Sequence, residues 1–218
     1  HSIDNVRRYI EEHHGCTLLV SLPMSSLKAA FEAGIKMFEI SGHPNARINR
    51  SEATLEEMVQ DIQTARSILG DDVHISAHGC GTYTSTTPVL FRDSDALTLS
   101  AVGAKSCHVH KHNLKDVEEI VRIAHRYGLL VEAFISHPKE KYYCYGISAG
   151  TPGKVSEVAK EMEKIGVDLI GLTTGMSYVG LDAGKITSDM QERLYALVNT
   201  ANVPTIVEGG ITLNNFKD

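Results

Sequence analysis

The chain has 218 residues, of which 42% are hydrophobic, so it can bury one substantial core. Its formal net charge of −6 at pH 7 offers no basic footprint for a nucleic acid, and no apolar run approaches the roughly 20 residues that span a bilayer. Four widely spaced cysteines without a Cys-x-x-Cys pair favour reduced thiols over a disulfide scaffold. We therefore expect a cytoplasmic protein with no nucleic-acid or membrane partner.

A short apolar strand followed by an amphipathic helix repeats along the whole chain. The strands are predicted at 17–22, 36–41, 72–78, 105–111, 129–136, 167–173 and 203–208. The helices are predicted at 25–33, 54–69, 93–102, 114–127, 154–165 and 188–200, after a first helix that ends near His13. This alternation predicts βαβ units and a parallel sheet.

Two architectures satisfy this alternation, a closed barrel and an open doubly wound sheet. A Rossmann-type sheet carries a glycine-rich turn after its first strand, whereas this chain reads Leu22-Pro23-Met24-Ser25-Ser26 there. Gly209 and Gly210 instead follow the seventh predicted strand, where a barrel places its phosphate loop. We therefore predict a single α/β domain over residues 1–218. It is a (β/α)8 TIM-type barrel with seven strands visible and the eighth outside this sequence.

The glycine pair itself predicts a phosphate site. Without a Cβ, the backbone N–H groups of Gly209 and Gly210 can approach an anion closely. Gly175, after the sixth predicted strand, is expected to contribute to the same site. The alternative is a plain tight turn at the end of a strand.

Four stretches resemble the ribulose-phosphate-binding barrels. Residues 18–27 (LLVSLPMSSL) are similar to that family's first strand, and residues 38–42 (FEISG) to its second, where a glutamate lies inside the barrel. Residues 203–211 (VPTIVEGGI) resemble its seventh strand and phosphate loop, and residues 182–185 (DAGK) resemble the segment after its sixth strand. The hexulose-6-phosphate synthase and 3-keto-gulonate-6-phosphate decarboxylase group is the most similar. The resemblance implies a small phosphorylated sugar as substrate, enediolate chemistry and a homodimer.

The chain also departs from that group at its catalytic positions. Pro23 stands where the first strand of the group ends in an aspartate. Residues 76–81 read SAHGCG in place of an Asp-x-Lys-x-x-Asp run, and residues 173–176 read TTGM in place of a His-Arg sequence. Because the enediolate-stabilising lysine and its paired aspartates are missing, we do not expect either of the group's usual reactions.

Polar side chains gather on one face of four predicted strands. Because strand residues alternate between faces, one face receives Glu39, then His74, Ser76 and His78, then His108, His110 and His112, then Glu132. The outer face of a barrel must bury apolar residues against helices, so we place the polar set inside.

From this set we predict four catalytic residues and a metal site. The catalytic residues are Glu39, His78, His110 and Glu132, and a divalent metal (Mg, Mn or Zn) is expected on Glu39, Glu132 and His110. A metal there could polarise a carbonyl group, and histidines could instead carry protons. The alternative is that the histidines are satisfied core residues. No nucleotide cofactor is expected.

The connection over residues 136–153 is long and rich in tyrosine and glycine, which predicts a lid or a dimer interface.

Three functions from different classes fit these patterns. The first is a sugar-phosphate lyase, epimerase or isomerase that works through an enolate or enediolate. The second is a metal-dependent acyl-type lyase, because His108-Val109-His110 resembles the His-x-His ligand pair of the hydroxymethylglutaryl-CoA lyase group. The Asp-Arg-Glu sequence that this group carries on its first strand is absent. The third is a non-catalytic sugar-phosphate-binding protein.

Overall fold

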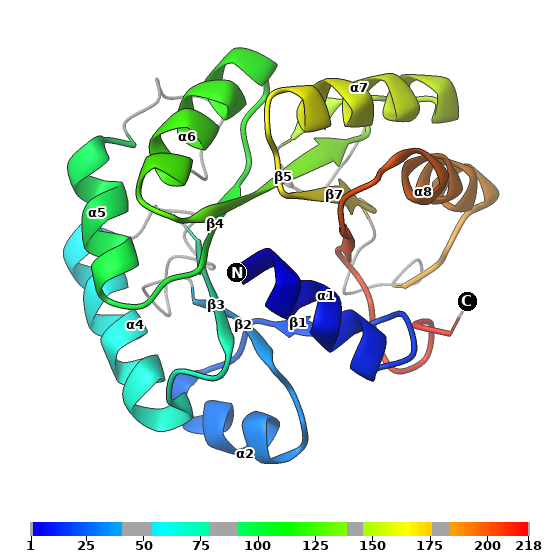
Figure 1. Cartoon of the computed structure of the whole chain (residues 1–218). Helices are drawn as coiled ribbons and strands as arrows, with labels where there is room; N and C mark the ends of the chain where they lie inside the picture. The colour runs from blue at the N-terminus through cyan, green and yellow to red at the C-terminus, as the bar shows by residue number, and fades with distance from the viewer. Residues whose placement is uncertain (1, 41–53, 79–90, 139–145, 176–183, 218) are drawn as a thin grey trace. The chain divides into compact units, whose positions relative to one another are not determined.

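The structure is a computed structural model that describes residues 2–40, 54–78, 91–138, 146–175 and 184–217 (Figure 1). Its strands are β1 (Leu19–Val20), β2 (Met37–Ile40), β3 (His74–His78), β4 (Ser106–Val109), β5 (Leu130–Ser136), β6 (Ile147–Ser148), β7 (Leu169–Thr173) and β8 (Thr205–Glu208). Its helices are α1 (Ser2–Glu12), the 3₁₀ turn η1 (Met24–Ser26), α2 (Leu27–Glu32), α4 (Leu55–Leu69), α5 (Asp93–Ala101), α6 (Leu114–Arg126), α7 (Pro152–Lys164) and α8 (Ser188–Thr200). All seven predicted strands form, and β6 is an additional short strand within the connection after β5.

The hydrogen-bonded strand order is β1-β2-β3-β4-β5-β7-β8, and β6 pairs with β5. Each strand register described is parallel. Helices separate most consecutive strands, as parallel connections require. The predicted βαβ organisation and parallel sheet are therefore confirmed.

The contacts divide the chain into two compact units. The first comprises His1–Val109 and Glu119–Val131, and the second comprises His110–Glu118 and Glu132–Asp218. Each unit is described by itself below. The single domain over residues 1–218 stays a prediction.

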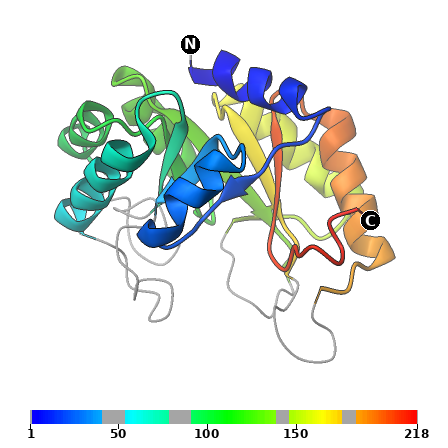
Figure 2. The same ribbon diagram turned by 90° about the horizontal axis from the view of Figure 1, so that it is seen from below.

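In the first unit, α4 and α5 lie beside each other against the strands (Figure 2). The buried residues of α4 recur at helical spacing, which creates one apolar face: Met58, Ile62, Ala65 and Leu69. The helix begins with a capping box, in which the Thr54 hydroxyl accepts from Glu57 N and the Glu57 carboxylate accepts from Thr54 N. These local signals explain why this helix is where the sequence predicts it.

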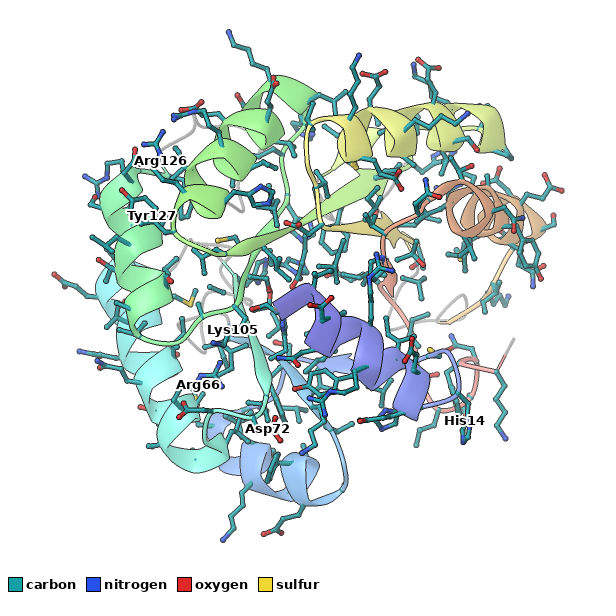
Figure 3. All side chains as sticks on the ribbon, in the orientation of Figure 1. His14, Arg66, Asp72, Lys105, Arg126 and Tyr127 are labelled. Atoms are coloured by element: carbon teal, nitrogen blue, oxygen red, sulfur yellow. The ribbon has the colours of Figure 1, made fainter. Side chains whose placement is uncertain are left out.

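Arg66 joins α4 to the loops at the amino ends of β3 and β4 (Figure 3). Its Nε donates to Gly103 O at 3.1 Å, and its Nη1 donates to Gly70 O and to Val73 O, each at 3.0 Å. Burial lowers the pKa of Arg66 below its ordinary value. The guanidinium thus satisfies three carbonyl groups that helix and strand ends leave without a regular partner.

In the second unit, α7 and α8 pack against each other. The Thr200 hydroxyl donates to Ser156 Oγ at 2.9 Å across this helix pair. On the strands, Gly171 of β7 lies opposite Phe134 of β5. A Cβ at Gly171 would fall 2.2 Å from ring atoms of Phe134, so the ring occupies space that only a glycine at residue 171 leaves open.

Some predictions are modified or untested. Strand β4 ends at Val109 rather than at residue 111. The lid prediction rests largely on residues 139–145, which lie outside the described residues. No described helix is long and apolar enough to cross a membrane.

Candidate active site

A carboxylate and two imidazoles meet on one face of the first unit's strands. Glu39 is the third residue of β2, His78 is the last residue of β3, and His108 is the third residue of β4. In the parallel register, His78 lies opposite His108, and Glu39 lies opposite Ser76. The three side chains therefore lie toward the carboxyl ends of neighbouring strands, where enzymes of this architecture place their active sites.

The distances within this group are short. Glu39 Oε1 lies 3.2 Å from Nδ1 of His78, and Oε2 lies 3.8 Å from Nδ1 of His108. The two imidazole rings are 4.8 Å apart between centroids and meet edge to face at 73°. The Glu39 and His108 side chains are 9% and 2% exposed, whereas that of His78 is 15% exposed. His78 is thus the member of the group that solvent reaches most easily.

The remaining polar side chains of this face confirm the predicted alternation. His74 Nε2 lies 2.8 Å from Ser106 Oγ, and each residue is the first of its strand. Ser76 is fully buried between Glu39 and Ser106 in the strand register. Its Oγ has no hydrogen-bond partner in the described part of the chain. This face is therefore polar along its length.

The group has two chemical capacities. If His78 Nδ1 carries a proton, it donates to Glu39, and Nε2 is then the basic nitrogen that can accept a proton from a substrate. If the Nδ1 atoms are unprotonated, they and the carboxylate are suitable ligands for a divalent cation. Both capacities serve the removal of a proton, or of a carbon substituent, next to a carbonyl group.

The second unit holds another histidine–carboxylate pair. His110 Nε2 lies 3.7 Å from Glu208 Oε2 at the end of β8. The imidazole stacks on the ring of Phe134, with centroids 4.6 Å apart and planes within 5°. The His110 side chain is 2% exposed and that of Glu208 is 32% exposed. The stacked ring fixes the imidazole plane, and the more exposed carboxylate can exchange protons with solvent.

The same face of the second unit carries a short hydroxyl chain. Thr173 Oγ1 lies 3.1 Å from Ser136 Oγ and 3.3 Å from Ile135 O. Thr173 pairs with Glu208 in the register of β7 and β8. Glu132 is fully buried two residues before Phe134 on the same side of β5. The polar face predicted for the fifth strand is therefore present.

Two side chains donate hydrogen bonds to the carbonyl groups of the Gly209-Gly210 turn and so stabilise it. Both glycines are buried and have positive φ, 103° and 64°. Thr174 Oγ1 donates to Gly209 O at 2.6 Å, and Asn215 Nδ2 donates to Gly210 O at 3.0 Å. No hydrogen bond donated by either glycine N–H is found among the described residues. Gly175 N lies 4.0 Å from the point where a Cβ on Gly209 would stand, so the two glycine turns are neighbours.

The structure divides the predicted site residues between the two units. Glu39 and His78 lie together in the first, whereas His110 and Glu132 belong to the second. The ligand set Glu39, Glu132 and His110 therefore stays a prediction. Strand alternation places His108 on the polar face without marking it as a site residue, and Glu208 is absent from the predicted site residues. The position of Glu208 is the sequence feature that indicates a site residue, because Glu208 is the last strand residue before the glycine pair.

No protein-family model matches the chain, and the search of curated proteins gives no match. Solved structures do match over nearly the whole chain. A 2,3-dimethylmalate lyase, described as a member of the PEP mutase/isocitrate lyase superfamily, is 14% identical with a TM-score of 0.63, over 99% of this chain and 77% of its own. The tryptophan synthase subunit alpha from Legionella pneumophila is 12% identical with a TM-score of 0.65, over 96% of this chain and 78% of its own.

An oxaloacetate acetylhydrolase gives a similar result. It is 14% identical with a TM-score of 0.60, over 99% of this chain and 76% of its own. At these identities the comparisons establish the fold alone. The fold is the parallel α/β fold of the TIM-barrel class, as predicted. The narrower resemblance to the hexulose-6-phosphate synthase group is not shown.

Proposed function

We propose that the protein is a lyase that cleaves a bond next to a carbonyl group of a small oxygenated acid, through an enolate. The observation that carries the proposal is the position of the Glu39 carboxylate between His78 and His108 at the carboxyl ends of β2, β3 and β4. A buried carboxylate shared by two imidazoles is costly for folding alone, because its desolvation must be offset. Functional sites are where such arrangements are retained.

In the proposed reaction, His78 is the proton carrier, since it is the most exposed of the three and Glu39 lies against its Nδ1. A base removes a proton from the substrate hydroxyl, the carbon–carbon bond breaks, and its electron pair remains on the carbon next to the carbonyl as an enolate. Return of the proton to that carbon completes the cycle. A divalent cation on the same residues would supply Lewis-acid stabilisation of the enolate oxygen, and His78 would then be a ligand rather than the proton carrier.

The structural comparisons support this chemistry as an analogy only. Two of the proteins with the same fold are named for reactions of small carboxylic acids, dimethylmalate in one case and oxaloacetate in the other. These substrates share a carboxylate next to an oxygenated carbon. We therefore take unphosphorylated hydroxy and oxo acids as the first substrate class to test.

A sugar-phosphate lyase, epimerase or isomerase is the second candidate. It is favoured by the buried Gly209-Gly210 turn, whose carbonyl groups are held by Thr174 and Asn215. A turn fixed in this way can present its N–H groups to a phosphate. The two candidates share enolate chemistry and differ in the anionic group of the substrate.

The test is hydrogen–deuterium exchange at the carbon next to the carbonyl, followed by NMR in deuterated water. Two panels of substrates are compared. The first contains hydroxy and oxo diacids without a phosphate group, and the second contains phosphorylated ketoses. We expect exchange and bond cleavage with members of the first panel. Activity confined to phosphorylated ketoses would select the second candidate. Failure of both panels would support the non-catalytic binding protein.

A matched pair of variants ties the activity to the site. Glu39→Gln should lower the exchange rate by at least about a hundredfold, the usual effect of removing a group engaged in proton transfer. Glu56→Gln changes an exposed carboxylate in the first turn of α4 and should leave the rate unchanged. Equal rates for the two variants would contradict the assignment of Glu39.

A further inference from the structure

We infer that Glu39, His78 and His108 form a metal site that selects a transition metal such as Zn²⁺ over Mg²⁺. The inference deepens the proposed function, because it names the cation that would act at the same residues. It retains Glu39 from the predicted ligand set and replaces the other two ligands. All three residues belong to the first unit.

The separations of the potential ligand atoms fit a single cation. Two atoms bound about 2.1 Å from one metal lie about 3.0–3.4 Å apart at angles between about 90° and 110°. Glu39 Oε1 and His78 Nδ1 are 3.2 Å apart, within this range. Glu39 Oε2 and His108 Nδ1 are 3.8 Å apart, which corresponds to a wider angle at the same bond length.

The two imidazoles also stand in suitable positions relative to each other. One ring nitrogen of His78 lies within 4.8 Å of one ring nitrogen of His108, and the rings meet edge to face. Both histidines come from strands whose register is fixed by main-chain hydrogen bonds, so the ligands are preorganised.

Charge and burial favour a cation at this point. The Glu39 side chain is 9% exposed and that of His108 is 2% exposed, so an ionised carboxylate here carries a desolvation cost that a bound cation would offset. A divalent ion bound by this carboxylate and the two imidazoles would bring a positive charge to the buried position. Ser76, fully buried and opposite Glu39 in the register, has an Oγ without a hydrogen-bond partner in the described chain. A water molecule bound to the metal would provide one.

The chemistry of the ligands determines the selectivity. Mg²⁺ prefers six oxygen ligands and gives up its waters reluctantly. Two imidazole nitrogens and one carboxylate form the donor set that zinc and iron sites use, with positions left open for water or substrate. The site therefore discriminates through nitrogen ligation rather than through size.

The experiment measures metal binding directly. Metal is removed from the full chain with a chelator, and the protein is titrated with Zn²⁺, Co²⁺ or Mg²⁺ in a calorimeter. The visible absorption spectrum of bound Co²⁺ reports whether nitrogen atoms ligate the ion and how many ligands surround it. We expect one Zn²⁺ per chain, bound at least a hundredfold more tightly than Mg²⁺. Zn²⁺ binding to the wild type that is no tighter than Mg²⁺ binding would overturn the inference.

Variants locate the ion. His78→Gln and Glu39→Gln should each weaken Zn²⁺ and Co²⁺ binding at least tenfold, and His78→Gln, at the more exposed position, is the variant expected to disturb folding least. His13→Gln changes an exposed histidine after α1 and should leave binding unchanged. Unchanged affinity in both site variants would place the ion elsewhere and refute the site. Full lyase activity in the stripped protein would refute the catalytic metal while leaving the proposed function intact.

Discussion

Glu39 Oε1 lies 3.2 Å from Nδ1 of His78, although the two residues are separated by 38 intervening positions in the sequence. The contact exists because β2 and β3 pair in the register Glu39 with Ser76, which brings the last residue of β3 beside the carboxylate. A carboxylate next to one imidazole nitrogen determines the proton position on the ring and so the role of the other nitrogen. The pair therefore fixes what His78 can do in catalysis.

The corresponding pair in the second unit yields the first prediction. Glu208→Gln keeps the shape of the side chain and removes the charge that lies 3.7 Å from His110 Nε2. If this pair moves a proton during turnover, kcat should fall at least tenfold while KM changes little. Steady-state kinetics on the best substrate of the exchange assay would measure both. Glu192→Gln, an exposed carboxylate on α8, is the control, and an equal kcat in the two variants would make Glu208 a structural residue.

The glycine turn yields the second prediction. Gly210→Val places a branched side chain at a residue with φ of 64°, which blocks the approach of an anion to the backbone. Binding of inorganic phosphate and of a pentose phosphate should weaken at least tenfold by calorimetry. Gly34→Val is the matched control, because Gly34 also has positive φ and nothing lies within 4 Å of its Cβ position. If both variants bind phosphate as the wild type does, the turn is not the phosphate site.

The strand faces could be predicted from the sequence because side chains on a strand alternate with a period of two. His74, Ser76 and His78 were expected on one face, and the contacts of His74 with Ser106 and of His78 with His108 confirm it. The alternation of side chains does not determine which residues of neighbouring strands lie opposite each other. The choice of His108 as the partner of Glu39 depends on where β4 starts against β3, which the main-chain pairing decides.

Other features arise from contacts that no local pattern encodes. In the sequence, Gly171 reads as a residue that merely weakens an apolar strand. In the structure, the ring of Phe134 on the neighbouring strand occupies the space that a side chain at residue 171 would need. Arg66 resembles a surface residue of an amphipathic helix, yet it binds three carbonyl groups from two loops. The expected homodimer also depends on surfaces that sequence patterns do not define, and it stays a prediction.

Arg66 yields the third prediction. Arg66→Lys keeps the charge but cannot reach Gly103 O, Gly70 O and Val73 O at once, because an ammonium group is compact. We expect a loss of about 1.5–3 kcal/mol in the free energy of unfolding, the usual value for hydrogen bonds from a charged group. Urea unfolding would measure it.

The control for Arg66 is Arg126, which is also labelled in Figure 3. Arg126 pairs with Asp93 on the surface, with 51% of the arginine side chain exposed. Exposed pairs contribute about 0–1 kcal/mol, so Arg126→Lys should change stability by less than Arg66→Lys. Equal effects would show that the carbonyl contacts of Arg66 add nothing beyond an ordinary surface charge.

The last prediction concerns the packing of Phe134 on Gly171. Gly171→Ala places a Cβ 2.2 Å from two ring carbons of Phe134, and the ring cannot move freely because His110 is stacked on it. We expect a loss of about 1–3 kcal/mol in the free energy of unfolding, typical of an overpacked core. Phe134→Leu in the Gly171→Ala background should recover part of this loss, so a double-mutant cycle should show coupling. Gly153→Ala, in the first turn of α7 with nothing within 4 Å of its Cβ position, should instead be neutral or stabilising. Additive effects of Gly171→Ala and Phe134→Leu would mean that the two residues do not constrain each other.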